Sequence, residues 1–429
     1  MRKLIIVVAL TLLTLVLWTG VVVGGIVEGW WRQPLAPRGD THAFAAAAFA
    51  EIDRRNKGNV AFTLLEHSNV AAEHFLSVGK PVDRDSLFQV ASLSKLITAW
   101  GVMTLVESGK LDLDAPVSKY LKRWHLPPSK FDNNAVTVRR LLSHTAGLTD
   151  GLGYQGFVPG QKIQSLEQSL TATADVSDGH DGHVRVGYAP GTDFQYSGGG
   201  FTLLQLLVED VSGQPFNDYM KRAVLEPLHM ANSTFVLPDS GTPHLAQFYD
   251  ADGKPATHYR FTAVAAASLY TSTSDLTRLL QAYLPGPHGE PAGRGVLRPA
   301  TLLEMRQPQA FQYGVAIWGL GTILYAGNNS GSFIIGHDGN NYPAINTAAR
   351  VDPASGDGIV LLETGNPLLA TEIAGEWVFW RTGNVDTFLV LMDLKRLFPL
   401  LAGGWVAIVL ASIFLGWRMR RKTATDAGA

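Results

Sequence analysis

The sequence predicts an α+β domain, in which helices flank an antiparallel sheet and form a separate helical lobe, with a transmembrane helix near each end of the chain. Three observations support this. Two strand-like runs joined by a short polar break, and then a buried helix, open the central part of the chain. Long apolar runs lie near both ends. The about 350 residues between these runs are enough for one large core.

The first apolar run, residues 4–27, directly follows Arg2 and Lys3. It is longer than the about 20 residues that span a bilayer, and longer than the apolar core of a signal peptide. No clear small-residue cleavage site follows it. We therefore expect residues 1–28 to form a retained N-terminal transmembrane anchor, with a cleaved signal peptide as the alternative, and residues 29–45 to form a tether.

A β-hairpin is predicted at the start of the domain that we place at residues 46–380. Strand-like runs at 59–66 and 70–78 flank a polar break at 67–69. Apolar and β-branched runs interrupted in this way are typical of two paired strands.

A helix with a reactive pair at its start follows the hairpin. The apolar stretch at 96–106 predicts a buried helix that ends at Gly109. Ser92 and Lys95 lie three residues apart at its start. Residues with this spacing share a helix face, so the amine can take the proton of the hydroxyl. The pair predicts a serine nucleophile, although S-x-x-K is a weak motif on its own.

A second motif, Tyr196-Ser197-Gly198, follows a turn at 189–191 and precedes a helical run at 201–211. Tyr196 is therefore expected just ahead of a helix, where neighbouring glycines expose it.

The third motif is Gly336-His337-Asp338-Gly339, which follows the apolar residues 333–335. This pattern predicts an edge strand whose glycines let a substrate approach the backbone closely.

In this order the three motifs resemble those of the penicillin-recognising serine hydrolases, which include class C β-lactamases, D-alanyl-D-alanine peptidases and related esterases: S-x-x-K, Y-x-N, and K-T-G or H-x-G. The resemblance runs from about Asn59 to Asn366, and family-like stretches at 141–148, 271–276 and 356–362 support it. It implies a fold like that of the β-lactamases and DD-peptidases, and a covalent acyl-enzyme on Ser92.

The resemblance also implies roles for individual residues. Lys95 and Tyr196 share the proton transfers, and the backbone N–H groups of Ser92 and Asn340 form the oxyanion hole. No metal or other cofactor is implied. The other residues of the second and third motifs are expected to line the substrate site: Ser197, Gly198, His337, Asp338 and Gly339.

Lysine and tyrosine ordinarily hold their protons too tightly to act as bases near neutral pH. We expect desolvation, the closeness of Lys95 to Tyr196 and the positive end of the helix to lower the pKa of both side chains. Which of the two is the general base stays open at this point.

Two departures from the family pattern bear on the substrate. Gly198 replaces an asparagine that helps to hold peptide or β-lactam side chains, and His337-Asp338 replaces the lysine and threonine that bind the substrate's carboxylate. A mostly neutral histidine beside an aspartate attracts a carboxylate less, or repels it. An ester, or an amide or peptide of a D-amino acid, is therefore the expected substrate.

Several alternatives remain at this stage. A D-Ala-D-Ala-type peptidase or a β-lactamase fits the same motifs, as does a peptidase that matures an exported metabolite. The alternative that is not an enzyme is a protein that binds a cell-wall ligand. The presence of Ser92, Lys95 and Tyr196 argues against it.

The second apolar run, at 397–417, is predicted to span the membrane between a tether at 381–396 and a basic tail at 418–429. Because cytoplasmic segments carry the excess of Lys and Arg, both ends are expected in the cytoplasm of a bacterium. The domain would then lie outside the inner membrane, in the periplasm.

Composition narrows the range of partners. The formal net charge of -2 gives no positive electrostatic field that would attract nucleic acid. The absence of cysteine excludes a thiol nucleophile, disulfides and cysteine-ligated zinc. Histidines and aspartates at 178–183 are interpreted as a loop rather than a metal site, and His144 as a structural residue. The expected partners are a small-molecule or peptide acyl substrate and the lipid bilayer, with the oligomeric state left open.

Overall fold

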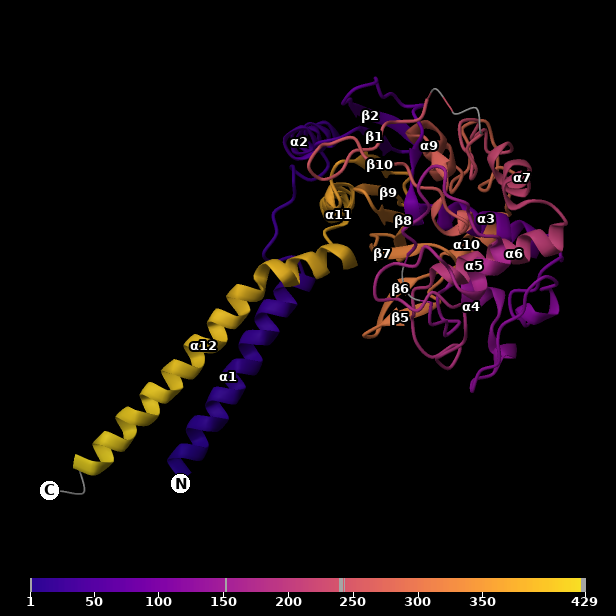
Figure 1. Cartoon of the computed structure of the whole chain (residues 1–429). Helices are drawn as coiled ribbons and strands as arrows, with labels where there is room; N and C mark the ends of the chain where they lie inside the picture. Colours follow the sequence, from indigo (N-terminus) through magenta and orange to yellow (C-terminus); the bar gives the residue numbers. More distant parts are fainter. Residues whose placement is uncertain (1, 151–152, 239–241, 243, 426–429) are drawn as a thin grey trace.

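An eight-stranded antiparallel sheet runs through the middle of the domain (Figure 1). The computed structural model describes residues 2–150, 153–238, 242 and 244–425. The strand order is β2-β1-β10-β9-β8-β7-β6-β5, so strands from the two ends of the domain meet in one sheet. β3 and β4 pair separately. The strands are β1 Val60–Glu66, β2 Asn69–Leu76, β3 Phe88–Gln89, β4 Tyr270–Thr271, β5 Ala310–Gln312, β6 Val315–Trp318, β7 Ile323–Gly327, β8 Phe333–Asn341, β9 Ile345–Val351 and β10 Gly358–Thr364.

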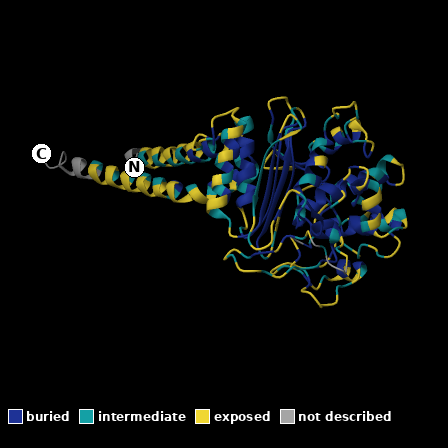
Figure 2. Ribbon diagram, turned by 90° about the horizontal axis from the view of Figure 1, so that it is seen from above, coloured by how far each residue is buried: buried dark blue, intermediate teal, exposed yellow. Residues whose placement is uncertain are grey.

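Helices cover both faces of the sheet, which confirms the predicted α+β class. α2 and α11 pack on one face, and a helical lobe built around α3 and α6 covers the other; Figure 2 shows the buried sheet between the two layers. The helices are α1 Arg2–Val27, α2 Thr41–Arg55, α3 Ser94–Glu107, α4 Val138–Leu142, α5 Leu166–Thr171, α6 Gly198–Ser212, α7 Phe216–Met220, α8 Val264–Ala267, α9 Thr273–Gln281, α10 Pro299–Met305, α11 Leu369–Thr382 and α12 Thr387–Thr425.

Strand β10 shows how the sheet separates two cores. All seven of its residues are buried, and successive side chains point to opposite faces. Ile359 and Leu361 pack with α2 and α11, whereas Val360 and Leu362 pack with the helical lobe. A strand covered on both faces requires such a continuous apolar sequence.

The predicted hairpin and the predicted helices are confirmed. β1 and β2 pair antiparallel through a turn at His67 and Ser68, which both adopt positive φ. α3 covers the predicted buried helix, and a 3₁₀ turn at Ala91–Leu93 precedes it. α6 begins at Gly198, three residues before the predicted run, and ends at the left-handed Gly213.

β8, which carries the third motif, is an interior strand, so the prediction of an edge strand was wrong. The short strands β5, β6 and β7, which no sequence pattern predicted, extend the sheet beyond it. β7 nevertheless pairs with β8 only from Phe333 to Gly336, and residues 337–341 pair with β9 alone. Within the described residues, the third motif from His337 on therefore keeps one backbone edge without a strand partner.

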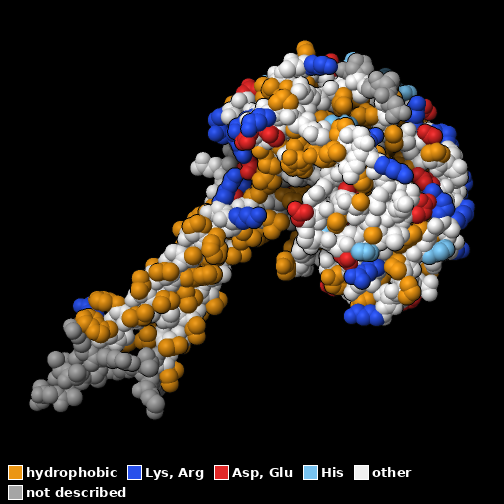
Figure 3. Space-filling model, in the orientation of Figure 1, with side chains coloured by type: hydrophobic (Ala, Val, Ile, Leu, Met, Phe, Trp, Pro, Cys, Tyr) orange, Lys and Arg blue, Asp and Glu red, His pale blue; other side chains and the backbone are white. Residues whose placement is uncertain are grey.

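Two helices, α1 and α12, are long and apolar enough to cross a membrane. They leave the domain on the same side (Figure 1), and their surface is largely hydrophobic (Figure 3). Trp18 Nε1 donates to the carbonyl of Leu401 at 3.2 Å, and the hydroxyls of Thr11 and Ser412 lie 2.7 Å apart. Met1 and residues 426–429 of the predicted tail lie outside the described residues.

The structure differs from both predicted tethers. α2 begins at Thr41, and α12 begins at Thr387, ten residues before the predicted span. Arg32 pairs with Asp393 of α12 at 2.6 Å and with Glu376 of α11. Ion pairs made by residues of the two predicted tethers therefore fasten the long helices to the domain.

Candidate active site

Ser92 lies in the 3₁₀ turn between β3 and α3. From Ser86 to Met103 it is the one residue that is not buried. The preceding Ala91 has a φ of 47°, a left-handed conformation that is costly for a residue with a side chain. This turn presents the Ser92 hydroxyl from an otherwise buried segment.

Two side chains lie within hydrogen-bond distance of that hydroxyl. Lys95 Nζ is 3.0 Å from Ser92 Oγ, and the hydroxyl of Tyr196, just ahead of α6, is 2.8 Å from the same oxygen. Nζ also donates to the carbonyl of Ala266 in α8 at 2.8 Å. The structure thus brings together the three residues that the motifs predict to act together.

Burial moves the pKa values of the two neighbours in opposite directions. Desolvation lowers the pKa of Lys95 to about 7, against a smaller opposing effect of Asp150. It raises the pKa of Tyr196, with only a partial offset from the hydrogen bond to Ser92. The expected fall is therefore confirmed for Lys95 and wrong for Tyr196, because burial disfavours the charged form, which in a phenol is the deprotonated one.

Aromatic neighbours and His144 hold Tyr196 in place. The ring of His144 stacks on that of Tyr196 with centroids 4.3 Å apart, and Trp318 of β6 packs edge-on at 5.7 Å. His144 Nδ1 accepts the N–H of Ser197 at 3.1 Å, and burial lowers the pKa of His144 well below its usual value. A neutral His144 therefore positions the second motif.

Asp150 joins the site without any signal in the sequence. Its carboxylate accepts the Ser197 hydroxyl at 2.5 Å and the Gly199 N–H at 2.7 Å, in the first turn of α6. Burial raises the pKa of Asp150 to about 6. Its partners lie 47 and 49 residues further along the chain, so no local pattern could have found it.

The third motif approaches Ser92 through the backbone of β8. A side chain at Gly339 would lie 2.1 Å from the carbonyl oxygen of Val90, so only glycine allows this approach. The hydroxyl of Thr347 in β9 donates to the same oxygen at 2.9 Å. Asn340 follows in β8, opposite Asn346 of β9, and its side chain donates to the carbonyl of Pro367.

His337 is uncharged. Burial lowers its pKa to about 3. Nδ1 lies 2.6 Å from the carbonyl oxygen of Asp338, which can only accept, so Nδ1 carries the proton. Nε2 is then an acceptor, and it is buried without a hydrogen-bond partner among the described residues.

Asp338 does not serve the substrate side, which corrects the role expected for it. Successive residues of a strand face opposite ways, and Asp338 accepts the Tyr325 hydroxyl at 2.6 Å and pairs with Arg350 of β9 at 2.6 Å. Arg350 also pairs with Asp386, just ahead of α12, at 2.5 Å. An ion-paired, buried Asp338 cannot repel a substrate carboxylate as the sequence suggested.

The place of the missing asparagine is filled. A side chain at Gly198 would lie 2.8 Å from Cε2 of Tyr154, whose hydroxyl is 2.6 Å from that of Thr202. The buried Tyr154 ring therefore occupies the space into which residue 198 would project.

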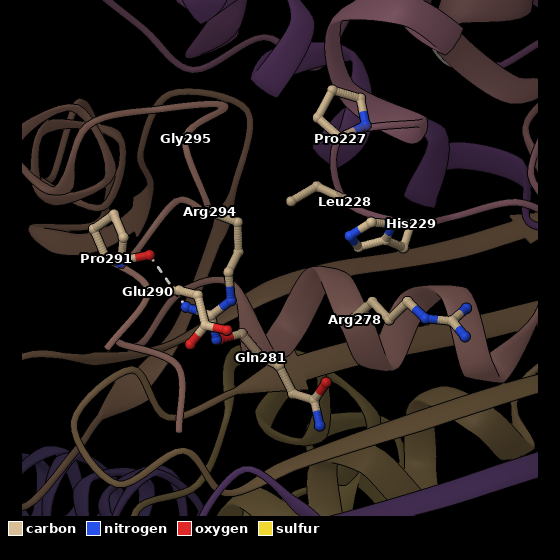
Figure 4. Close-up of a pocket in the computed structure, with 9 residues that line it drawn as sticks. All are labelled: Pro227, Leu228, His229, Arg278, Gln281, Glu290, Pro291, Arg294 and Gly295. Carbon is tan, nitrogen blue, oxygen red and sulfur yellow. Dashed lines mark hydrogen bonds between the residues drawn. The ribbon is translucent and has the colours of Figure 1, made fainter. Parts of the chain in front are cut away.

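Two other clusters of the described residues offer neither a metal site nor an unpaired cation. Among the described residues no group of three His, Asp or Glu side chains could hold a metal ion, and in the loop at 178–183 His183 contacts Asp181 instead. A pocket of about 480 Å³ between α9 and the 290–295 loop contains Arg278 and Arg294 (Figure 4). Both cations already have partners: Asp275 for Arg278, and backbone carbonyls for Arg294.

Curated relatives match parts of the chain. Protein flp of Staphylococcus aureus is 26% identical over 210 residues, which cover 47% of this chain and 39% of flp, so the chain spans about two fifths of that relative. Penicillin-binding protein 4 of Amycolatopsis lactamdurans is 29% identical over 301 residues, which cover 67% of this chain and 74% of that protein.

A solved structure and a family model agree with these relatives. The structure of the octameric penicillin-binding protein homologue from Pyrococcus abyssi superposes with a TM-score of 0.64 at 23% identity, covering 79% of this chain and 76% of that one. Residues 44–377 match the sequence model of the family described as Beta-lactamase. Because this match covers well over half of the chain, the protein belongs to the β-lactamase family of serine hydrolases.

Proposed function

We propose that the protein is a membrane-anchored serine hydrolase that forms a covalent acyl-enzyme on Ser92 and acts on an ester, or on an amide or peptide of a D-amino acid, outside the inner membrane. One observation carries the proposal: Ser92 Oγ lies 3.0 Å from the amine of Lys95 and 2.8 Å from the hydroxyl of Tyr196. A hydroxyl between a base and a proton donor is the arrangement that acyl transfer requires.

The pKa directions of Lys95 and Tyr196 support a role for each of them. A neutral Lys95 amine takes the proton of Ser92 as its oxygen bonds to the acyl carbonyl carbon. Tyr196, which burial keeps protonated, gives its proton to the leaving group, and Lys95 returns a proton to Tyr196. Water then repeats the sequence and releases the acid and free Ser92.

Backbone donors would stabilise the oxyanion. The N–H of Ser92, in the 3₁₀ turn ahead of α3, and that of Asn340 in β8 are the proposed pair, because β8 packs against this turn. Removing one such donor typically costs about 2.7–4 kcal/mol of transition-state stabilisation.

The charges of the third motif support this substrate class. His337, in place of the usual lysine, is neutral, and Asp338 is paired with Arg350. The third motif therefore offers no cation to a carboxylate and no free anion that repels one. Esters and D-amino-acid amides, which lack that carboxylate, are the best fit.

The location rests on α1 and α12. Both are long and apolar enough to span a bilayer, and the basic residues at the start of α1 and the end of α12 favour cytoplasmic ends. The domain between them would face the periplasm.

Turnover by the full chain in detergent tests this proposal. We expect a p-nitrophenyl ester and a D-amino-acid amide to be hydrolysed faster than nitrocefin, and mass spectrometry to find a fluorophosphonate adduct on Ser92. Ser92→Ala should abolish both signals. An inert Ser92 would favour a binding protein, and fast turnover of nitrocefin alone would favour a β-lactamase.

A further inference from the structure

The tip of the β5–β6 hairpin presents apolar side chains to solvent. Phe311, Tyr313 and Val315 are 56%, 97% and 59% exposed. The sequence has no Asp, Glu, Lys or Arg from 307 to 337. Edge strands in water usually carry charges that prevent unwanted pairing, and β5 forms an edge of the sheet without them.

The tip lies at the end of the sheet where α12 begins. β6 pairs antiparallel with β7 through Trp318 and Ile323, so the start of β6 lies toward the last residue of β7, Gly327. The carbonyl of Gly327 accepts the side chain of Asn384, just ahead of α12, at 2.8 Å. Figure 1 shows the β5–β6 tip directed to the side from which α1 and α12 leave, and Figure 3 shows hydrophobic surface there.

We propose that the β5–β6 tip docks into the interface of the lipid bilayer that α1 and α12 span. This inference rests on the membrane anchoring in the proposed function. Aromatic rings with one polar end favour the headgroup region of a bilayer. Trp30 and Trp31, exposed directly after α1, suit the same level. An uncharged tip enters this region without stripping water from an ion.

Docking would fix the height of the active site above the lipid. β6 runs from the tip to Trp318, whose ring contacts those of His144, Tyr196 and His337 at centroid distances of 4.8, 5.7 and 5.3 Å. A tip held in the interface therefore holds a strand that packs directly on the residues around Ser92.

Single-cysteine labelling tests the docking, because the chain contains no cysteine of its own. The full-length Tyr313→Cys variant carries an environment-sensitive fluorophore in nanodiscs that hold one chain each. We expect blue-shifted emission, quenching by lipids brominated near the headgroup, and protection from iodide. Asp218→Cys, on α7 at the far side of the lobe (Figure 1), is the aqueous control, and Leu410→Cys, within α12, is the membrane control.

The outcomes separate docking from anchoring. If the probe at 313 is quenched by iodide as strongly as that at 218, while the probe at 410 is quenched by lipid, docking is wrong and anchoring stands. If the probe at 410 is not quenched by lipid, anchoring itself fails. Protection at 313 that depends on protein concentration in detergent would indicate a second copy on the edge strand and would also overturn the proposal. Ester turnover checks that each labelled chain is folded. If the Tyr313→Cys variant does not fold, Phe311→Cys takes its place.

Discussion

At the residue scale, the protonation of Lys95 controls the proposed reaction. Its pKa of about 7 means that the neutral amine, which accepts the Ser92 proton, predominates only above that pH. We expect kcat/KM for an uncharged ester to rise about tenfold per pH unit below about pH 7 and to level off above it. A stopped assay across this range measures the profile, and a flat acidic limb would contradict the role of Lys95.

Asp150 is expected to shift the pH at which the acidic limb of this profile falls. Its negative charge favours the protonated form of Lys95, so Asp150→Asn should lower the pKa of Lys95 and move the acidic limb to lower pH. The amide oxygen can still accept from Ser197 or Gly199.

Asp275→Asn is the matched control for Asp150→Asn. Asp275 is also buried and also accepts a serine hydroxyl, that of Ser233, and a backbone N–H, that of Asn232. Its replacement should leave the pH profile unchanged. A shift of the limb to higher pH in Asp150→Asn would refute the electrostatic explanation.

Gly198 is expected to resist the asparagine of the family pattern. Because its Cβ would lie 2.8 Å from Tyr154, Gly198→Asn should destabilise the fold by about 1–3 kcal/mol through overpacking. In a Tyr154→Ala background most of that extra cost should disappear. Thermal unfolding of the four chains measures the coupling, and an equal cost in both backgrounds would show that Tyr154 is not the obstacle.

At the scale of elements, buried ion pairs join α12 to the strand of the third motif. Asp386 accepts the N–H of Leu389 in the first turn of α12 and pairs with Arg350 of β9, which pairs with Asp338 of β8. The chain of contacts therefore runs from α12 to the residue beside His337.

Breaking this chain should be costly. Asp386→Ala leaves the buried Arg350 with one anion, and the loss of one partner of a buried pair typically costs about 3–5 kcal/mol. Asp53→Ala removes an exposed carboxylate from His74 and should cost at most about 1 kcal/mol. The melting temperatures of the two variants give the comparison, and similar values would mean that the buried contacts contribute little.

At the scale of the whole molecule, the proposed topology predicts which sites reagents reach. In cells with a permeabilised outer membrane, a membrane-impermeant maleimide should label Asp218→Cys but not Leu410→Cys. The reason is that α7 lies in the domain and residue 410 lies within the apolar part of α12. Labelling at 218 only after lysis would place the domain in the cytoplasm.

Local patterns predicted much of this architecture. The hairpin, α3 and α6 each show an apolar run and a turn or glycine within one short stretch of the sequence. β5, β6 and β7 have three to five residues each and escaped prediction because so short a run shows no period. Asp150, Tyr154 and Arg350 escaped because their partners are distant in the sequence.

By itself, the sequence determined which chemical groups this protein has: a serine with a lysine one helical turn away, a tyrosine ahead of glycines, and two apolar runs long enough to span a bilayer. Local spacing suffices for these, because helix geometry and apolar runs are properties of neighbouring residues. Only the tertiary structure decided that Asp338 turns to Arg350 and that burial raises one pKa while it lowers another. The physical reason is that burial and ion pairing are set by residues that meet across the folded chain.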